Sequence, residues 1–274
     1  MNDLDGRVAA VTGGARGIGL ATARALSAQG MRVAIGDLDA DQAAGVAESI
    51  GGGVIGLGLD VTDRESYTEF VDGAEAQLGP LDVLVNNAGI MHVGPFLEED
   101  GALTERTLDV NVRGVLHGMK IAVPRFCARG RGHLVNVAST AGRVGYPGGA
   151  TYCGSKFFVI GCSEALRLEL HGTDVEVSCV MPGIVNTELT SGLPRPRFVR
   201  DIEPEDVAEA IVRALRRPRF DVYVPRALGW AINGSALVPR RARESLARRL
   251  RWDRFLLDYD PRVRDAYERR AAAS

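Results

Sequence analysis

The chain has 274 residues, of which 46% are hydrophobic and 25% charged, and its formal net charge is −2. This length and composition are typical of a globular protein with enough core to fold unaided. The balanced charge excludes a general attraction to nucleic acid, and no apolar run approaches the roughly 18 residues of a transmembrane helix. The first strand begins almost at the N-terminus, so we expect no targeting signal and a soluble, cytoplasmic protein of enzyme size.

Cysteine and histidine show no spacing that would hold a metal ion. The cysteines are Cys127, Cys153, Cys162 and Cys179, and the histidines are His92, His117, His133 and His171. We therefore predict no metal site and interpret the cysteines as reduced thiols.

Short apolar runs alternate with longer amphipathic stretches through most of the chain. The predicted strands are Arg7–Thr12, Arg32–Gly36, Gly53–Leu59, Val83–Val85, His133–Val137, Val175–Val180 and Asp221–Val224. The predicted helices lie at 17–29, 40–50, 63–78, 102–127, 150–171 and 204–216. Apolar strands separated by helices indicate a doubly wound parallel sheet of α/β (Rossmann) type with about seven strands. We predict one such domain over residues 1–225 and a C-terminal helical extension over residues 226–274.

A glycine-rich turn follows the first predicted strand and opens the first predicted helix. It reads Thr12-Gly13-Gly14-Ala15-Arg16-Gly17-Ile18-Gly19. Glycines let the backbone turn tightly and approach a pyrophosphate, whose charge a helix N-terminus favours. This setting predicts a dinucleotide site formed by Gly13, Arg16, Gly17, Ile18 and Gly19.

Asp37, at the end of the second predicted strand, bears on the choice between NAD and NADP. A carboxylate there accepts hydrogen bonds from the ribose hydroxyls of NAD and repels the 2′-phosphate of NADP. Arg16 has the opposite tendency, because a guanidinium in the loop could pair with that phosphate. We predict NAD(H) rather than NADP(H), while a simple turn or N-cap role for Asp37 stays open.

The third and fourth predicted strands also end in polar residues. Asp60-Val61 follows the third strand, and Asn87-Ala88-Gly89 follows the fourth. Ligands bind at the carboxyl ends of strands in such sheets, so we place all five residues at the cofactor. Turn formation is the alternative, since Asp, Asn and Gly are common loop formers.

Tyr152 and Lys156 stand four residues apart on one helix face. The chain has 33 basic residues, and only Lys120 and Lys156 are lysines. An ammonium beside a phenol favours the phenolate and lowers a pKa that is ordinarily about 10. Ser139 closes the fifth predicted strand, close enough for a loop to bring its hydroxyl to the phenol. The three side chains suit acid–base chemistry at an alcohol carbon.

Together these residues resemble the classical short-chain dehydrogenase/reductase family over residues 5 to about 225. The ordered features are the TGxxxGxG loop at 12–19, Asp60, the NNAG segment at 86–89, Asn111, Ser139, Tyr152, Lys156 and Pro182-Gly183. The resemblance implies Tyr152 as general acid/base and Ser139 as the donor that orients the substrate oxygen. It implies that Lys156 holds the nicotinamide ribose, that Asn111 shapes the helix holding a relay water, and that Val185 and Thr187 touch the carboxamide.

Residues 184–202 are expected to cover the substrate. Three arginines there, Arg195, Arg197 and Arg200, would meet an anionic group or simply face solvent. His92, Val93 and Phe96 are hypothesised to line the substrate cleft, and Cys153 is interpreted as a small residue packed beside Tyr152.

The C-terminal extension is apolar at 227–238 and basic and amphipathic over 240–257, where Leu246, Leu250 and Leu257 share one helix face. Such a segment suits contact with an anionic membrane surface, or docking onto its own domain or a second subunit. We leave both open, and expect a homo-oligomer, dimeric or tetrameric.

The sequence therefore predicts an oxidoreductase that exchanges hydride between NAD(H) and a lipophilic secondary alcohol or ketone. Steroid, retinoid, fatty or terpenoid alcohols are the expected small-molecule substrates. An NADPH-dependent 3-oxoacyl-thioester reductase is the alternative of the same fold. A catalytically silent nucleotide-sensing or membrane-tethered module is the alternative of another class.

Overall fold

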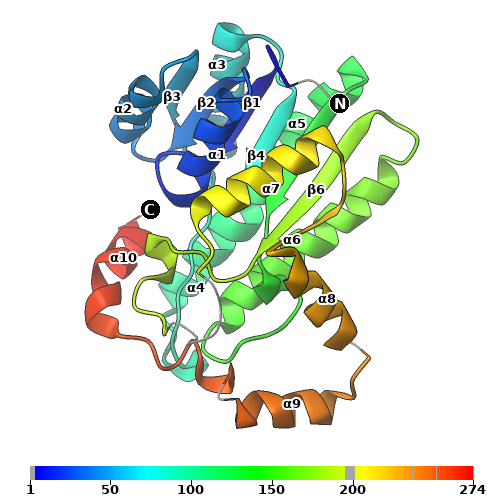
Figure 1. The fold of residues 1–274 in the computed structure, drawn as a ribbon. Coiled ribbons are helices and arrows are strands. Elements are labelled where there is room, and N and C mark those ends of the chain that lie inside the picture. Colours follow the sequence, from blue (N-terminus) through cyan, green and yellow to red (C-terminus); the bar gives the residue numbers. More distant parts are fainter. Residues whose placement is uncertain (1–3, 195–200, 236, 251, 274) are drawn as a thin grey trace.

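The computed structural model describes residues 4–194, 201–235, 237–250 and 252–273 (Figure 1). Its centre is a seven-stranded sheet in the order β3-β2-β1-β4-β5-β6-β7, with every neighbouring pair parallel. The strands are β1 Val8–Thr12, β2 Arg32–Asp37, β3 Val54–Gly58, β4 Val83–Asn86, β5 Gly132–Val137, β6 Val175–Pro182 and β7 Asp221–Val224. The predicted doubly wound Rossmann sheet is confirmed.

The strand order reverses between β1 and β4. Ala10 of β1 pairs with Ala34 of β2 on one side and with Leu84 of β4 on the other. Connections leave β1 and β4 toward opposite faces, which opens a crevice at the carboxyl ends of these strands. The functional site is expected at that edge.

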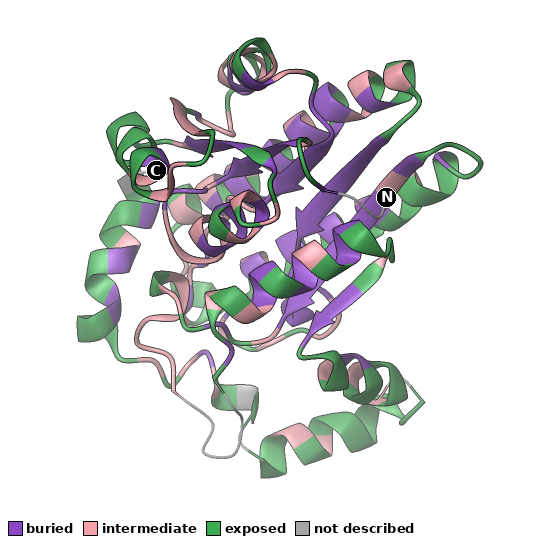
Figure 2. Ribbon diagram, turned by 45° about the horizontal axis from the view of Figure 1, so that its top comes forward, coloured by how far each residue is buried: buried purple, intermediate pink, exposed green. Residues whose placement is uncertain are grey.

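Helices cover both faces of the sheet. They are α1 Gly17–Ser27, α2 Ala40–Ile50, α3 Arg64–Leu78, α4 Gly101–Leu108, α5 Val115–Arg129, α6 Ala150–Glu169, α7 Pro204–Arg216, α8 Arg226–Ser235, α9 Arg240–Arg249 and α10 Pro261–Ala273. One apolar cluster joins α1, α2 and α7 to the sheet, and a second joins α3, α5 and α6 to the opposite face. Figure 2 shows the buried strands between these exposed helix surfaces.

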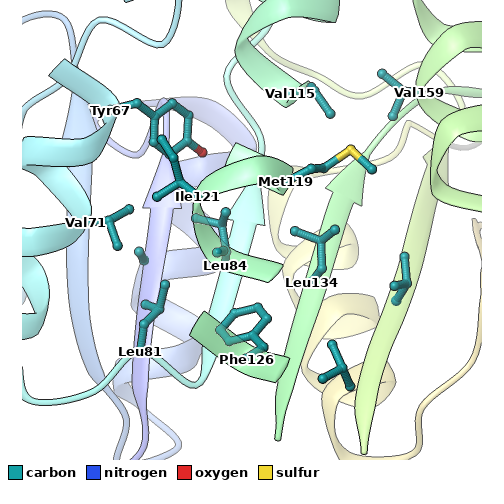
Figure 3. Close-up of a cluster of buried hydrophobic side chains, with 14 of the residues drawn as sticks. Tyr67, Val71, Leu81, Leu84, Val115, Met119, Ile121, Phe126, Leu134 and Val159 are labelled. Atoms are coloured by element: carbon teal, nitrogen blue, oxygen red, sulfur yellow. The ribbon is translucent and has the colours of Figure 1, made fainter. Parts of the chain in front are cut away.

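The larger cluster is built from side chains that alternate along the strands and repeat along the helices. Figure 3 shows Tyr67 from α3, Met119 and Phe126 from α5, and Leu134 from β5 within it. Each such side chain stabilises the fold by about 1.5–3 kcal/mol when fully buried. The Tyr67 hydroxyl donates to Asn86 Oδ1 at 2.5 Å, which satisfies a polar group inside the core.

The single helix predicted over 102–127 is wrong. The structure has α4, then a π-helical segment η2 at Asp109–Gly114, and then α5. The π-helical segment carries the buried side chain of Asn111 toward the backbone of Ile90. Hydrophobic periodicity cannot reveal one wider turn inside a long apolar pattern.

The helix predicted over 240–257 is also too long, since α9 ends at Arg249. Leu246 and Leu250 are 57% and 52% exposed, so the predicted leucine stripe is not buried along its length. A short 3₁₀ turn, η5 Trp252–Arg254, and α10 follow; the helical extension was predicted as a whole, but the separate helix α10 and its bounds were not. Within the described ranges, every helix is too short or too polar to cross a bilayer.

Candidate active site

A cavity of about 1300 Å³ runs along the carboxyl edge of the sheet. The predicted site residues that line it are Gly13, Arg16, Gly17, Ile18, Asp37, Asp60, Val61, Asn87, Ala88, Gly89, Ser139, Tyr152, Lys156, Val185 and Thr187. Gly19 and Asn111 do not line it. The structure thus brings together residues from β1 to the segment after β6 in one space.

The turn after β1 has the backbone that the glycines were expected to give. Gly13 and Gly17 have φ of +61° and +52°, where other residues are strained. A Cβ on Gly19 would lie 2.1 Å from the Gly13 carbonyl oxygen, so the close packing of the turn requires glycine at this position. Arg16 precedes α1 without a side-chain cap, and the first-turn amides therefore keep their capacity for an anion. The site fits a pyrophosphate.

Asp37 and Arg16 differ in the contacts that their side chains make within the protein. The Asp37 Oδ2 accepts the Ala15 amide at 3.1 Å, and the carboxylate lines the cavity. The Arg16 guanidinium donates to Gln42 Oε1 and lies 3.7 Å from the Glu188 carboxylate. Protein partners therefore hold Arg16, while Asp37 presents negative charge to the cavity.

The residues after β3 and β4 are also bound by the protein itself. Asp60 Oδ1 accepts from both the amide and the hydroxyl of Thr62, which is the turn role that the sequence left open. The Asn87 side chain donates to the carbonyls of Thr12 and Gly13 at 2.9 and 3.1 Å. Asn87 thereby ties the end of β4 to the glycine turn.

Ser139, Tyr152 and Lys156 meet at the centre of the cavity. Ser139 follows β5 and caps a short turn by accepting the Ala141 amide at 3.1 Å. Tyr152 lies in the first turn of α6 and Lys156 one turn later. The Lys156 Nζ is 5.7 Å from the centre of the Tyr152 ring and donates to the Val137 carbonyl at 3.1 Å.

Burial governs the ionisation of this pair. It raises the pKa of Tyr152 well above the ordinary 10.0, and the interaction with the Ser139 side chain only partly opposes that rise. It lowers the pKa of Lys156 from 10.5 to about 8. The expected lowering of the Tyr152 pKa by Lys156 is not seen in this structure, where desolvation disfavours the charged form of both groups.

Asn111 organises backbone beside the cavity. Its Oδ1 accepts the Ile90 amide at 2.9 Å, and its Nδ2 donates to the Ile90 carbonyl at 2.8 Å and to Ser155 Oγ at 3.0 Å. A Cβ on Gly89 would lie 3.2 Å from Asn111 Oδ1 and 3.4 Å from Lys156 Nζ. Asn111 therefore supports the floor of the site through the chain after β4.

The residues predicted to line the substrate cleft lie in different surroundings. Val93 is buried in a small apolar cluster with Tyr152 and Cys153, as the sequence suggested for Cys153. His92 instead binds Glu268 through Nδ1 at 2.9 Å, and Phe96 is 66% exposed. Arg195, Arg197 and Arg200 lie outside the described residues.

Residues of α10 at the site were missed, and Tyr267, Arg270 and Ala271 are those that line the cavity. Tyr267 lines the cavity, and its hydroxyl oxygen accepts the Met91 amide at 2.8 Å. Arg264 is fully buried behind it. The signal that could have located the helix is Asp260-Pro261, because Asp260 accepts the Arg262 amide at 2.9 Å as a cap and proline is favoured in a first turn.

Comparison with known proteins gives the same picture. Residues 7–197 match the family model described as short chain dehydrogenase. Glycine betaine reductase ATRR of Emericella nidulans is 39% identical over 78% of this chain, although the match spans 18% of that longer protein. A 3-alpha-(or 20-beta)-hydroxysteroid dehydrogenase of Mycobacterium tuberculosis is 38% identical, over 76% of this chain and 82% of its own length. A solved short chain dehydrogenase/reductase from Burkholderia phymatum, in complex with NAD, has a TM-score of 0.79 at 26% identity and covers 85% of this chain and 94% of that one.

Proposed function

Because this chain belongs to the short-chain dehydrogenase family, and is thus an NAD(P)-dependent oxidoreductase of CH–OH groups, we propose that it uses NAD(H) on a lipophilic secondary alcohol or ketone. The observation that carries the proposal is the convergence of Ser139, Tyr152 and Lys156 in one cavity with Asp37.

Each of the three polar side chains would have a separate role in the reaction. Tyr152 would take the proton of an alcohol or give one to a ketone, and Ser139 would donate a hydrogen bond to the same oxygen. Lys156, close to Gly89, would hold the nicotinamide ribose and stabilise the phenolate once it forms. Bound nicotinamide supplies the hydride acceptor or donor.

Two observations favour NAD(H) over NADP(H). Asp37 places a carboxylate on the cavity wall, where it would repel a 2′-phosphate, and Arg16 already has Gln42 and Glu188 as partners. The related solved structure from Burkholderia phymatum also contains NAD. The rival NADPH-dependent 3-oxoacyl-thioester reductase needs Arg16 to leave these partners.

Apolar side chains around Tyr152 favour a lipophilic substrate. Met91 and Leu256, which belong to the same apolar cluster as Tyr152, line the cavity, as do Leu189, Leu193 and Phe255 beside them. A flat hydrocarbon skeleton would find contacts there worth about 25 cal/mol per Å² of apolar area buried. The Mycobacterium tuberculosis relative acts, by its name, on hydroxysteroids, which agrees with this class.

A homo-oligomer is also proposed, on the basis of α6. Phe157, Phe158 and Leu168 are 47%, 37% and 63% exposed on this helix. Large apolar side chains grouped on one helix suit a contact with a second copy of the chain. Sedimentation equilibrium of the purified protein would give its mass, and a strictly monomeric species would contradict the proposal.

Peripheral contact with an anionic bilayer is proposed for α8, α9 and η5. Trp230, Leu246 and Trp252 are 85%, 57% and 57% exposed, and α9 carries five arginines against one glutamate. Apolar and cationic side chains together suit an anionic lipid surface. Co-sedimentation with vesicles of anionic but not of zwitterionic lipid is expected; equal recovery with both would contradict it.

The proposed cofactor is tested by fluorescence titration of the purified protein with NADH and NADPH at one salt concentration. NADH is expected to bind at least about tenfold more tightly, a difference of about 1.4 kcal/mol. Tighter NADPH binding would favour the thioester-reductase rival. Binding of neither nucleotide would contradict the enzyme assignment and would leave only the membrane-tethered form of the silent-module alternative.

A further inference from the structure

Arg264 of α10 joins three segments that are far apart in the sequence. Its side chain is 0% exposed. Its Nη1 donates to the carbonyls of Leu189 and Ser191 at 3.0 and 3.1 Å, its Nη2 donates to the Met91 carbonyl, and its Nε pairs with Glu268. A planar guanidinium can serve all these acceptors at once, which an ammonium cannot.

Further contacts fix α10 against the same two segments. Glu268 binds His92 at 2.9 Å, and Arg270 binds Glu188 at 2.8 Å. The amide of Asp260 donates to the Gly192 carbonyl at 2.8 Å, and a Cβ on Gly192 would lie 2.6 Å from the Asp260 carbonyl oxygen. The chain after β6 therefore packs directly on the start of α10.

Tyr267 brings this helix to the reacting centre. Its ring lies 4.8 Å from the Arg264 guanidinium, and its side chain lines the cavity that also contains Tyr152. Burial raises the pKa of Tyr267 to about 12, so the hydroxyl keeps its proton at neutral pH. The oxygen accepts the Met91 amide, and in the described part of the chain its proton has no recorded acceptor. That proton is available to a ligand in the cavity.

We propose that α10 forms the specificity wall of the substrate site, with Arg264 as the positioning residue and Tyr267 as a donor to a second oxygen of the substrate. The inference rests on the proposed dehydrogenase function and narrows its substrates to secondary alcohols or ketones that carry a further acceptor oxygen. Arg264 keeps residues 189–193 against Met91, and Tyr267, which binds the Met91 amide, lines the same cavity as Tyr152.

The positioning role is tested with Arg264→Lys, and Arg269→Lys is the matched control. Arg269 lies on the same helix with a side chain 72% exposed. Hydrogen exchange of the amides at 189–193 is expected to quicken at least about tenfold in Arg264→Lys and to stay unchanged in Arg269→Lys. The alcohol KM should rise at least about tenfold, with the NADH Kd within about twofold. Unchanged exchange, or an equal rise in the NADH Kd, would overturn the assignment.

The specificity role is tested with Tyr267→Phe on cyclohexanol and the positional cyclohexanediols. The wild type is expected to prefer at least one diol over cyclohexanol by about tenfold in kcat/KM, and Tyr267→Phe should bring that ratio close to one. The control is Tyr259→Phe, which changes a residue of the same extension that does not line the cavity. This variant should keep the preference for the diol. A preference that survives Tyr267→Phe, or no preference in the wild type, would overturn the role of Tyr267.

The role of Arg264 can be contradicted separately from the dehydrogenase function. A wild type that oxidises none of these alcohols with either nucleotide contradicts the dehydrogenase function and the role of Tyr267 together. The exchange experiment needs no substrate, so the placement of residues 189–193 by Arg264 stands or falls independently.

Discussion

At the scale of single residues, the sequence predicted that Ser139, Tyr152 and Lys156 lie together, but it did not predict the effect of burial on the pKa values of the last two. Tyr152 and Lys156 share a helix face and lie in one cavity with Ser139, as the spacing predicted. Burial of both is set by the packing of α6 on β5 and by Leu256 from the extension, which no local pattern contains. Desolvation therefore governs two pKa values that the pair alone would have moved differently.

The lowered pKa of Lys156 predicts a pH-dependent cost in stability. Between about pH 8 and 10.5 the unfolded chain holds this proton and the folded chain does not, so the free energy of unfolding rises with pH. Relative to Lys156→Met, the wild type should gain about 1 kcal/mol per pH unit in that window. Urea unfolding of both proteins without added nucleotide, from pH 7 to 10, measures the difference. A difference that is constant with pH would contradict the lowered pKa.

Asp37 is expected to set the choice of nucleotide. Asp37→Ser removes the carboxylate that would accept the ribose hydroxyls, so the NADH Kd should rise about tenfold and the NADPH Kd should fall. The exposed Asp41 of α2 offers a control, since Asp41→Ser should change neither constant. Fluorescence titration measures the Kd of each variant for NADH and for NADPH. An unaltered NADH-to-NADPH ratio in Asp37→Ser would show that the carboxylate does not discriminate.

At the scale of elements, alternation and periodicity predicted the strands of the sheet, but they did not predict the local irregularities of the helices. Within the π-helical segment η2, Asn111 binds the backbone of Ile90, a contact between residues 21 positions apart. The break after Arg249 follows no proline or glycine. The cap at Asp260-Pro261 was visible in the sequence, so α10 could have been predicted, but its docking partners could not.

The glycine turn gives a sharp test of packing at this scale. Gly19→Ala would place a methyl group 2.1 Å from the Gly13 carbonyl oxygen, so we expect NADH binding to weaken by at least about tenfold. Gly45→Ala is the matched control, because a Cβ there meets nothing within 4 Å and alanine stabilises a helix interior by about 0.5–1 kcal/mol. Titration with NADH and thermal unfolding of both variants distinguish them. Equal binding by Gly19→Ala would contradict the tight-turn account.

At the scale of the whole molecule, the C-terminal extension has two parts that pack differently. The segment from Leu256 through α10 packs on the site, whereas α9 is exposed on most of its surface (Figures 1 and 2). Docking depends on buried contacts of Arg264 and Tyr267 with residues more than 70 positions earlier, such as Leu189 and Met91. A charge count of the extension could not separate the two parts. The domain boundary at residue 225 stays a prediction.

Oxidation of an alcohol by this protein needs the Tyr152 phenol, the carboxyl edge of the sheet and the nucleotide cavity together. The most direct measurement is NADH formation from NAD and a panel of lipophilic secondary alcohols, by the wild type and by Tyr152→Phe. The account predicts turnover by the wild type and a fall in kcat of about 10²–10⁴-fold in Tyr152→Phe, with the NADH Kd within about twofold. Equal turnover by the two proteins, or NADH binding without oxidation of any alcohol, would contradict it.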